Sequence, residues 1–194
     1  MSFVPFEITV CGIEELAGYC QAGVSHVLSL LDPDHPPPPA FGAFGEHARL
    51  ELRFHDVIDE REGMVAPQPA DVARLLAFGR GLLEARPPQT HLLVHCHAGV
   101  SRSTAAMAVL LAQARPDRPA AEALAEVVRI RPHAWPNLRV VELGDALLGR
   151  RGELVAAVRA HYEARVADDP LLARALVESG RGREVEIGVR RGQS

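Results

Sequence analysis

The segment HCHAGVSRS, residues 95–103, places a cysteine six residues before an arginine. A cysteine thiolate can act as a nucleophile or as a metal ligand, and an arginine guanidinium can bind two oxygens of one anion. These residue types therefore allow two kinds of chemistry. One is a metal site that combines the cysteine with its flanking histidines, and the other is attack of the thiolate on a bound oxyanion.

A metal site would need ligands that converge on one point. His95, Cys96 and His97 are consecutive, so their side chains point in different directions on a strand or a turn. Zinc ligands usually come as closely spaced pairs from two separate segments, and the remaining cysteines, Cys11 and Cys20, form no such pair. The sequence therefore predicts no metal and no other cofactor.

An oxyanion site would need a loop whose backbone N–H groups converge. HLLVH, residues 91–95, is apolar enough for a buried strand, and a helix is expected to begin at Arg102 or Ser103. The small residues between them would let the backbone curl around one tetrahedral anion, and the N-terminus of the helix would strengthen the binding. The residues expected to bind the anion are His97, Ala98, Gly99, Val100, Ser101 and Arg102.

The same geometry would activate Cys96 as a nucleophile. Helix N-termini and nearby cations lower the pKa of a cysteine thiol from about 8.5 to roughly 3.5–7.5. A fall of about three units corresponds to about 4 kcal/mol in favour of the thiolate. The loop would thus hold a nucleophile beside its anionic target.

HCHAGVSRS resembles the signature loop C-x5-R-S of the cysteine-based protein tyrosine phosphatase superfamily, and it is especially similar to the HCxAGxSRS pattern of the dual-specificity branch. The resemblance covers about Val24 to Leu148. It implies a metal-independent phosphomonoester hydrolase in which Cys96 forms a phosphocysteine intermediate and Arg102 binds the phosphoryl oxygens. It also implies that Ser103 hydrogen-bonds the cysteine sulfur and that His95 supports the loop.

Departure of the leaving group would also need a proton donor. In the family this donor is an aspartate on the loop after the preceding strand, and the segment FHDVIDE offers Asp56 and Asp59. Asp56, directly after the strand, is the preferred candidate for the proton donor. Asp59 is the alternative donor. A third interpretation is that both aspartates only solvate a turn and neither donates a proton. The later segment RPHAWPN resembles one in which the family uses an asparagine, here Asn137, to support the loop.

Hydrophobic periodicity indicates the elements that must position these residues. Strands are predicted at residues 6–10, 24–31, 48–55 and 91–95. Helices are predicted after residue 12 and at residues 69–85, 103–115, 120–131, 138–148, 153–166 and 171–179. Residues 32–40 are proline-rich and predict a loop without a helix, and the charged residues after 179 show only a weak alternation at 185, 187 and 189.

This order of elements predicts an α/β fold, with a central, mostly parallel sheet of about four to five strands flanked by helices, phosphatase-like, and with a helical C-terminal half. We expect a single phosphatase-like catalytic domain over residues 1–167. Residues 168–194 form a C-terminal extension of unknown role.

Composition limits the partners of the protein. The net charge of −4 and the pI of about 6.1 argue against a general nucleic-acid binder. No stretch approaches the ~18 apolar residues that a membrane span needs. No signal peptide is recognisable, and three cysteines without a pairing pattern favour a reducing, cytoplasmic location. The expected partner is a phosphorylated protein or a small phosphomonoester, and the sequence does not indicate the oligomeric state.

Other functions stay open beside that of a protein phosphatase. A pseudophosphatase would keep the phosphate-binding loop without turnover, and a phosphatase for a phosphoinositide would use the same residues. A rhodanese-type sulfurtransferase also has a cysteine in a loop before a helix, but it would not need the Arg102-Ser103 pair. An aromatic content of 5% leaves few rings to stack on a phosphotyrosine. Cys11 and Cys20 are redox partners for Cys96 only if the fold brings them close.

Overall fold

A four-stranded parallel sheet forms the centre of the protein in the computed structural model, which describes residues 3–85 and 90–189. The strands are β1 (Glu7–Cys11), β2 (His26–Leu31), β3 (Ala48–Arg53) and β4 (His91–His95). Their order across the sheet is β1-β4-β2-β3, and every neighbouring pair is parallel. The predicted α/β class with a parallel sheet is therefore confirmed.

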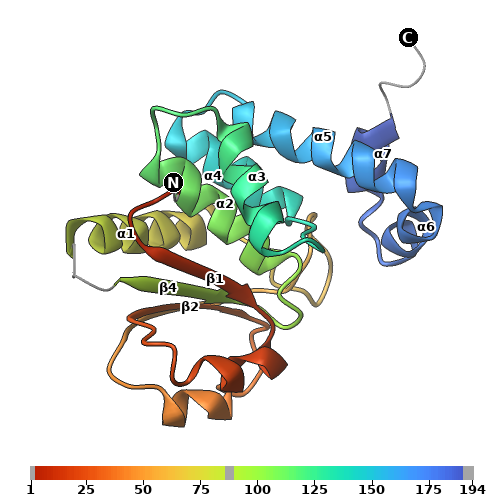
Figure 1. Cartoon of the computed structure of the whole chain (residues 1–194). Coiled ribbons are helices and arrows are strands. Elements are labelled where there is room, and N and C mark those ends of the chain that lie inside the picture. The colour runs from red at the N-terminus through yellow and green to blue at the C-terminus, as the bar shows by residue number, and fades with distance from the viewer. Residues whose placement is uncertain (1–2, 86–89, 190–194) are drawn as a thin grey trace.

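Helices cover both faces of the sheet, with α-helices on one face and two short 3-10 helices on the other (Figure 1). The α-helices are α1 (Pro69–Ala85), α2 (Arg102–Ala114), α3 (Ala120–Ile130), α4 (Leu138–Leu148), α5 (Glu153–Asp168), α6 (Pro170–Glu178) and α7 (Gly182–Val189). The larger hydrophobic core lies against one face of the sheet and continues among the helices as far as Leu176 of α6 and Val185 of α7. The 3-10 helices η1 (Ile13–Tyr19) and η2 (Pro39–Ala43) close a smaller core on the other face. The inner strands are buried on both sides, which explains their continuous apolar sequences.

The α2 helix lies at the centre of the larger core. Its residues from Arg102 to Ala112 are all buried, and its alanines allow neighbouring helices to approach closely. A Cβ atom added to Gly144 of α4 would lie 2.3 Å from a methyl group of Val109, so only glycine fits at this contact. The helix that follows the candidate loop is therefore held firmly from several sides.

Two segments differ from the sequence-based expectation. The proline-rich stretch was predicted to contain no helix, but η2 begins inside it at Pro39, because proline is tolerated in the first turn of a helix. Residues Gly182–Val189, expected as a weakly alternating tail, form the helix α7. Within the described residues no helix is both long and apolar enough to cross a lipid bilayer.

The parallel sheet determines where a site can form. The carboxyl ends of parallel strands meet at one edge, which is where ligands bind in open α/β sheets. Gly12 follows β1, Asp32 follows β2, Asp56 lies three residues after β3, and Cys96 follows β4. These residues, distant in the sequence, therefore share one edge of the molecule.

Candidate active site

The loop between β4 and α2, residues 96–101, turns its carbonyl groups away from its centre. Each carbonyl from His97 to Ser101 accepts a hydrogen bond from a surrounding segment. In order along the loop, the donors are Ile13 N (2.9 Å to His97 O), Arg131 Nη2 (3.0 Å to Ala98 O), Arg131 Nε (3.0 Å to Gly99 O), Trp135 N (2.8 Å to Val100 O) and Asn137 N (3.2 Å to Ser101 O).

The N–H groups of the same peptides face the opposite way. A peptide unit is planar and trans, so the N–H of one residue points away from the carbonyl of the residue before it. Among the hydrogen bonds of residues 3–85 and 90–189, none uses a backbone N–H from Ala98 to Arg102 as its donor. Outward carbonyls thus leave a ring of inward donors, which is the arrangement that binds an anion.

Glycines make this curvature possible. Gly99 has a φ of +69°, and a Cβ atom there would lie 2.4 Å from the carbonyl carbon of Cys11. A Cβ atom on Gly12 would lie 2.9 Å from the carbonyl oxygen of His97. Both contacts bring the loop against the end of β1, and a side chain at either position would push the two backbones apart.

Arg131 and Glu15 clamp the outside of the loop, and neither was singled out from the sequence. The Arg131 guanidinium forms two hydrogen bonds with the Glu15 carboxylate, at 2.8 and 2.7 Å, while it also holds two carbonyls of the loop. Glu15 in turn accepts a hydrogen bond from Gly12 N at 2.6 Å. The hydrogen bond from Arg131 lowers the pKa of Glu15, so the clamp stays charged at neutral pH.

Cys96 lies buried at the base of the loop, with its sulfur 3.1 Å from the Ser103 hydroxyl. His95, also buried, has its Nε2 atom 2.7 Å from the Ser29 hydroxyl. Burial lowers the pKa of His95 to about 4, so the ring is neutral at physiological pH. The neutral ring therefore ties the end of β4, directly before the loop, to Ser29 of β2, and its Nδ1 atom is buried with no hydrogen-bond partner among the described residues.

Arg102 is buried and held on one side only. Its Nη1 atom donates to Asp32 Oδ1 at 2.6 Å and to the carbonyl of Phe54 at 2.7 Å. Its Nε atom is buried and has no hydrogen-bond partner within the described residues. Asp32, expected only as part of the proline-rich loop, thus orients the arginine while part of the guanidinium remains available to a ligand.

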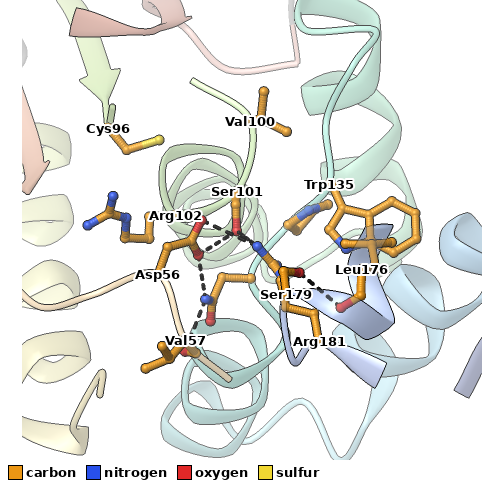
Figure 2. Close-up of polar contacts among 12 residues, drawn as sticks. Asp56, Val57, Cys96, Val100, Ser101, Arg102, Trp135, Leu176, Ser179 and Arg181 are labelled. Atoms are coloured by element: carbon orange, nitrogen blue, oxygen red, sulfur yellow. Dashed lines mark hydrogen bonds and ion pairs between the residues drawn. The ribbon is translucent and has the colours of Figure 1, made fainter. Parts of the chain in front are cut away.

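The structure separates the two aspartates of FHDVIDE. Asp56 Oδ1 accepts hydrogen bonds from the Ser101 hydroxyl at 2.7 Å and from Asn137 Nδ2 at 2.8 Å (Figure 2). Asp59 instead lies 3.2 Å from Arg183, and its side chain is half-exposed. Asp56, and not Asp59, therefore contacts the loop around Cys96.

Asn137 joins the two loops that meet at this edge. Besides Asp56, its Nδ2 atom donates to the carbonyl of Val57 at 3.2 Å, and its backbone N–H donates to Ser101. Its Oδ1 atom accepts from Val140 N at 3.1 Å and so caps α4, as expected of an asparagine directly before a helix. The side chain of Asn137 thus ties the start of α4 to the loop after β3, and its backbone N–H holds the loop that follows β4.

A cavity of about 650 Å³ opens beside the loop. Its lining residues come from the end of β1, from η1, from the proline-rich segment and from the loop itself: Gly12, Ile13, Glu14, Glu15, His35, His97 and Ala98. The rings of His35 and His97 meet edge to face at 4.5 Å. The volume of the cavity lies in the range of ordinary small-molecule sites. In the described residues, no group of three or more metal-ligating side chains gathers at one point.

Comparisons with known proteins identify the fold. No protein-family model matches the sequence, and no curated protein matches it. Solved structures do match, among them human DUSP28 (19% identity, 74% of this chain and 94% of that chain, TM-score 0.54), the human tyrosine phosphatase-like serine/threonine/tyrosine-interacting protein (18%, 77% and 95%, 0.56) and PTPMT1 in complex with PI(5)P (16%, 74% and 91%, 0.52). At these identities the likeness concerns the fold. The chain therefore has the fold of the cysteine-based protein tyrosine phosphatase superfamily, in its dual-specificity-like form.

Proposed function

We propose that the protein is a metal-independent phosphomonoester hydrolase that acts through a phosphocysteine intermediate. One observation carries this proposal. The backbone N–H groups from Ala98 to Arg102 point inward, next to the Cys96 thiol and Nε of Arg102, and none of these nitrogens has a partner among residues 3–85 and 90–189. Such a site matches the tetrahedral oxygens of a phosphoryl group and places a nucleophile against the phosphorus.

In the first displacement, the Cys96 sulfur attacks phosphorus, the S–P bond forms and the bond from phosphorus to the leaving oxygen breaks. Asp56 gives a proton to that oxygen and becomes a carboxylate. Arg102 and the loop N–H groups stabilise the charge that builds up on the equatorial oxygens. The hydrogen bonds from Ser101 and Asn137 keep Asp56 at the rim of the loop for this transfer.

In the second displacement, water attacks the phosphocysteine, its proton passes to the Asp56 carboxylate, and the S–P bond breaks. The sulfur leaves as a thiolate, and the Ser103 hydroxyl, 3.1 Å away, donates a hydrogen bond to it. Inorganic phosphate is released, and both groups return to their starting protonation states. The two steps need no metal and no further reactant besides water.

Hydrolysis of p-nitrophenyl phosphate in the presence of a chelator, between pH 5 and 7, tests the proposal. We expect turnover in the wild type, none in Cys96→Ser, and retained binding of vanadate by that variant. Asp59→Asn provides a matched control for Asp56→Asn, because both lie on the same loop and only Asp56 contacts Ser101. Turnover by Cys96→Ser would refute the cysteine nucleophile.

The substrate class is tested by a panel of phosphopeptides, phosphoinositides and small phosphomonoesters. A phosphoinositide belongs in the panel because one protein of similar fold, PTPMT1, was crystallised with PI(5)P. Another protein of similar fold is described as phosphatase-like, which makes a non-catalytic module the alternative outcome. Binding of phosphate or vanadate without turnover of any substrate would establish that alternative.

A further inference from the structure

The C-terminal residues 179–183 lie against the loop that carries Asp56. Arg61 of that loop donates to the carbonyl of Ser179 at 3.1 Å and to that of Gly180. From the opposite direction, Arg183 donates to the carbonyl of Ile58 at 3.0 Å and pairs with Asp59 at 3.2 Å. The turn between α6 and α7 and the loop after β3 thus hold each other by reciprocal arginine contacts.

Arg181, at the centre of this contact, reaches the candidate active site (Figure 2). Its Nη1 atom donates to the Ser101 hydroxyl at 2.9 Å and lies 3.3 Å from Asp56 Oδ2. The remaining oxygen of the same carboxyl group, Oδ1, is held by Ser101 and Asn137. Asp56 is therefore fixed at both oxygens, and Arg181 supplies the contact to the second one.

Arg181 is itself fixed by Glu184, which is completely buried. The Nε and Nη2 atoms of Arg181 donate to the two Glu184 oxygens at 2.7 and 2.8 Å. Glu184 also accepts hydrogen bonds from Trp135 Nε1 at 2.7 Å and from Leu138 N at 3.1 Å. The guanidinium is thus tied to the residues that begin α4 and has little freedom to move.

The environment keeps this guanidinium positively charged. Burial alone would disfavour the charge, but the hydrogen bonds of Glu184 and the charges of Asp56 and Glu184 raise the pKa of Arg181 above its ordinary value. As Asp56 gives its proton to a leaving group, negative charge develops 3.3 Å from Nη1. A fixed cation at that distance stabilises the developing charge without reorganisation.

We propose that Arg181 is a positioning residue for the Asp56 carboxyl group, so that the C-terminal segment, residues 170–189, is part of the catalytic unit. The inference rests on the proposed function, in which Asp56 exchanges the proton. Substrates with poor leaving groups depend most on this proton transfer, so they should depend most on Arg181.

The test compares Arg181→Gln with the wild type on two substrates, phenyl phosphate, whose leaving group is poor, and p-nitrophenyl phosphate, whose leaving group is good. We expect kcat/KM to fall about tenfold more for phenyl phosphate than for p-nitrophenyl phosphate, within the range that general acids contribute. Arg174→Gln is the matched control, because Arg174 is exposed on α6 and carries the same charge. Its kcat/KM should stay within about twofold on both substrates.

A double-mutant cycle tests whether Arg181 acts through Asp56. In the Asp56→Asn background, adding Arg181→Gln should change hydrolysis of phenyl phosphate by less than about twofold, because coupled residues are not additive. If Arg181→Gln does not fold, Arg181→Lys replaces it. Lysine keeps the charge but cannot reach Glu184, Asp56 and Ser101 together, so the same selective loss is expected.

Equal losses on the two substrates, or a full additional loss in the Asp56→Asn background, would overturn the role of Arg181. These outcomes differ from a failure of the proposed function. If Asp56→Asn shows no dependence on the leaving group, Asp56 is not the acid and the inference falls with it. Turnover by Cys96→Ser would instead refute the proposed reaction itself.

Discussion

Replacing Glu184 by alanine removes a buried carboxylate that joins α7 to the rest of the protein. Glu184 is 0% exposed, and it accepts hydrogen bonds from Trp135, Leu138, Tyr162 and Arg181. Removing one member of a buried ion pair costs about 3–5 kcal/mol. A buried indole N–H left without an acceptor costs roughly a further 1–3 kcal/mol.

The stability lost in Glu184→Ala should be smaller than the sum of the ion-pair and hydrogen-bond costs. Arg181 keeps its contact with Asp56, and water can enter beside α7. We expect Glu184→Ala to lower the free energy of unfolding by about 4 kcal/mol. For a domain of this size, ~3 °C per kcal/mol then gives a fall in Tm of about 12 °C.

Urea unfolding and thermal melting followed by circular dichroism would measure this loss. Glu186→Ala is the matched control, since Glu186 is exposed on the same helix, and it should change the stability by less than about 0.5 kcal/mol. Glu184→Gln keeps an acceptor oxygen and should lose about half as much as alanine. If the unfolding free energies of Glu184→Ala and Glu186→Ala differ by less than about 1 kcal/mol, the buried network around Glu184 does not stabilise the fold.

Other consequences follow from the loop and its supports. Gly99→Ala should lower kcat/KM more than ~100-fold and cost about 2 kcal/mol of stability, because its Cβ atom would meet the backbone of Cys11. Gly63→Ala, with a similar φ of +73° and nothing within 4 Å, shows the cost of the backbone conformation alone, and an equal loss of activity there would contradict the argument. Asp32→Asn should weaken vanadate inhibition about tenfold, or ~1.4 kcal/mol, since Arg102 loses its orienting carboxylate, and an unchanged inhibition constant would exclude that role. Burial lowers the pKa of His95 to about 4 from an ordinary 6.5. Between these pH values the unfolded chain binds a proton on His95 that the folded chain does not. The free energy of unfolding should therefore fall by about 3 kcal/mol as the pH drops from 6.5 to 4. Urea unfolding at pH 7 and 4.5 should show a smaller fall for His95→Gln, and an identical fall would rule out His95 as the source.

Features encoded within one short segment could be predicted from the sequence. HCHAGVSRS contains the strand end, the small turn residues and the helix start, so its loop was expected, and the Cys96–Ser103 pair lies within it. Asn137 and the helix it caps are equally local. In these places hydrophobic periodicity and capping agree with the tertiary structure, which is why the strands and most helices were correctly located.

Features that depend on distant contacts could not be predicted. Arg181 and Asp56 are 125 residues apart, and nothing in the sequence near either one indicates the other. Residues 182–189 are too few to form a stable helix alone, and α7 forms where Glu184 meets buried donors from other elements. Asp32 was missed for a related reason, because its partner Arg102 is brought near only by the order of the strands.

The inward N–H groups of the loop also connect catalysis to stability. An oxyanion that satisfies them binds the folded chain and not the unfolded one, so phosphate at about 100 times its Kd would add about 2.7 kcal/mol to the free energy of unfolding. Inorganic phosphate is the product of the proposed reaction. Each turnover would therefore end in a product complex more resistant to unfolding than the free protein, and the same donors would oppose release of the product.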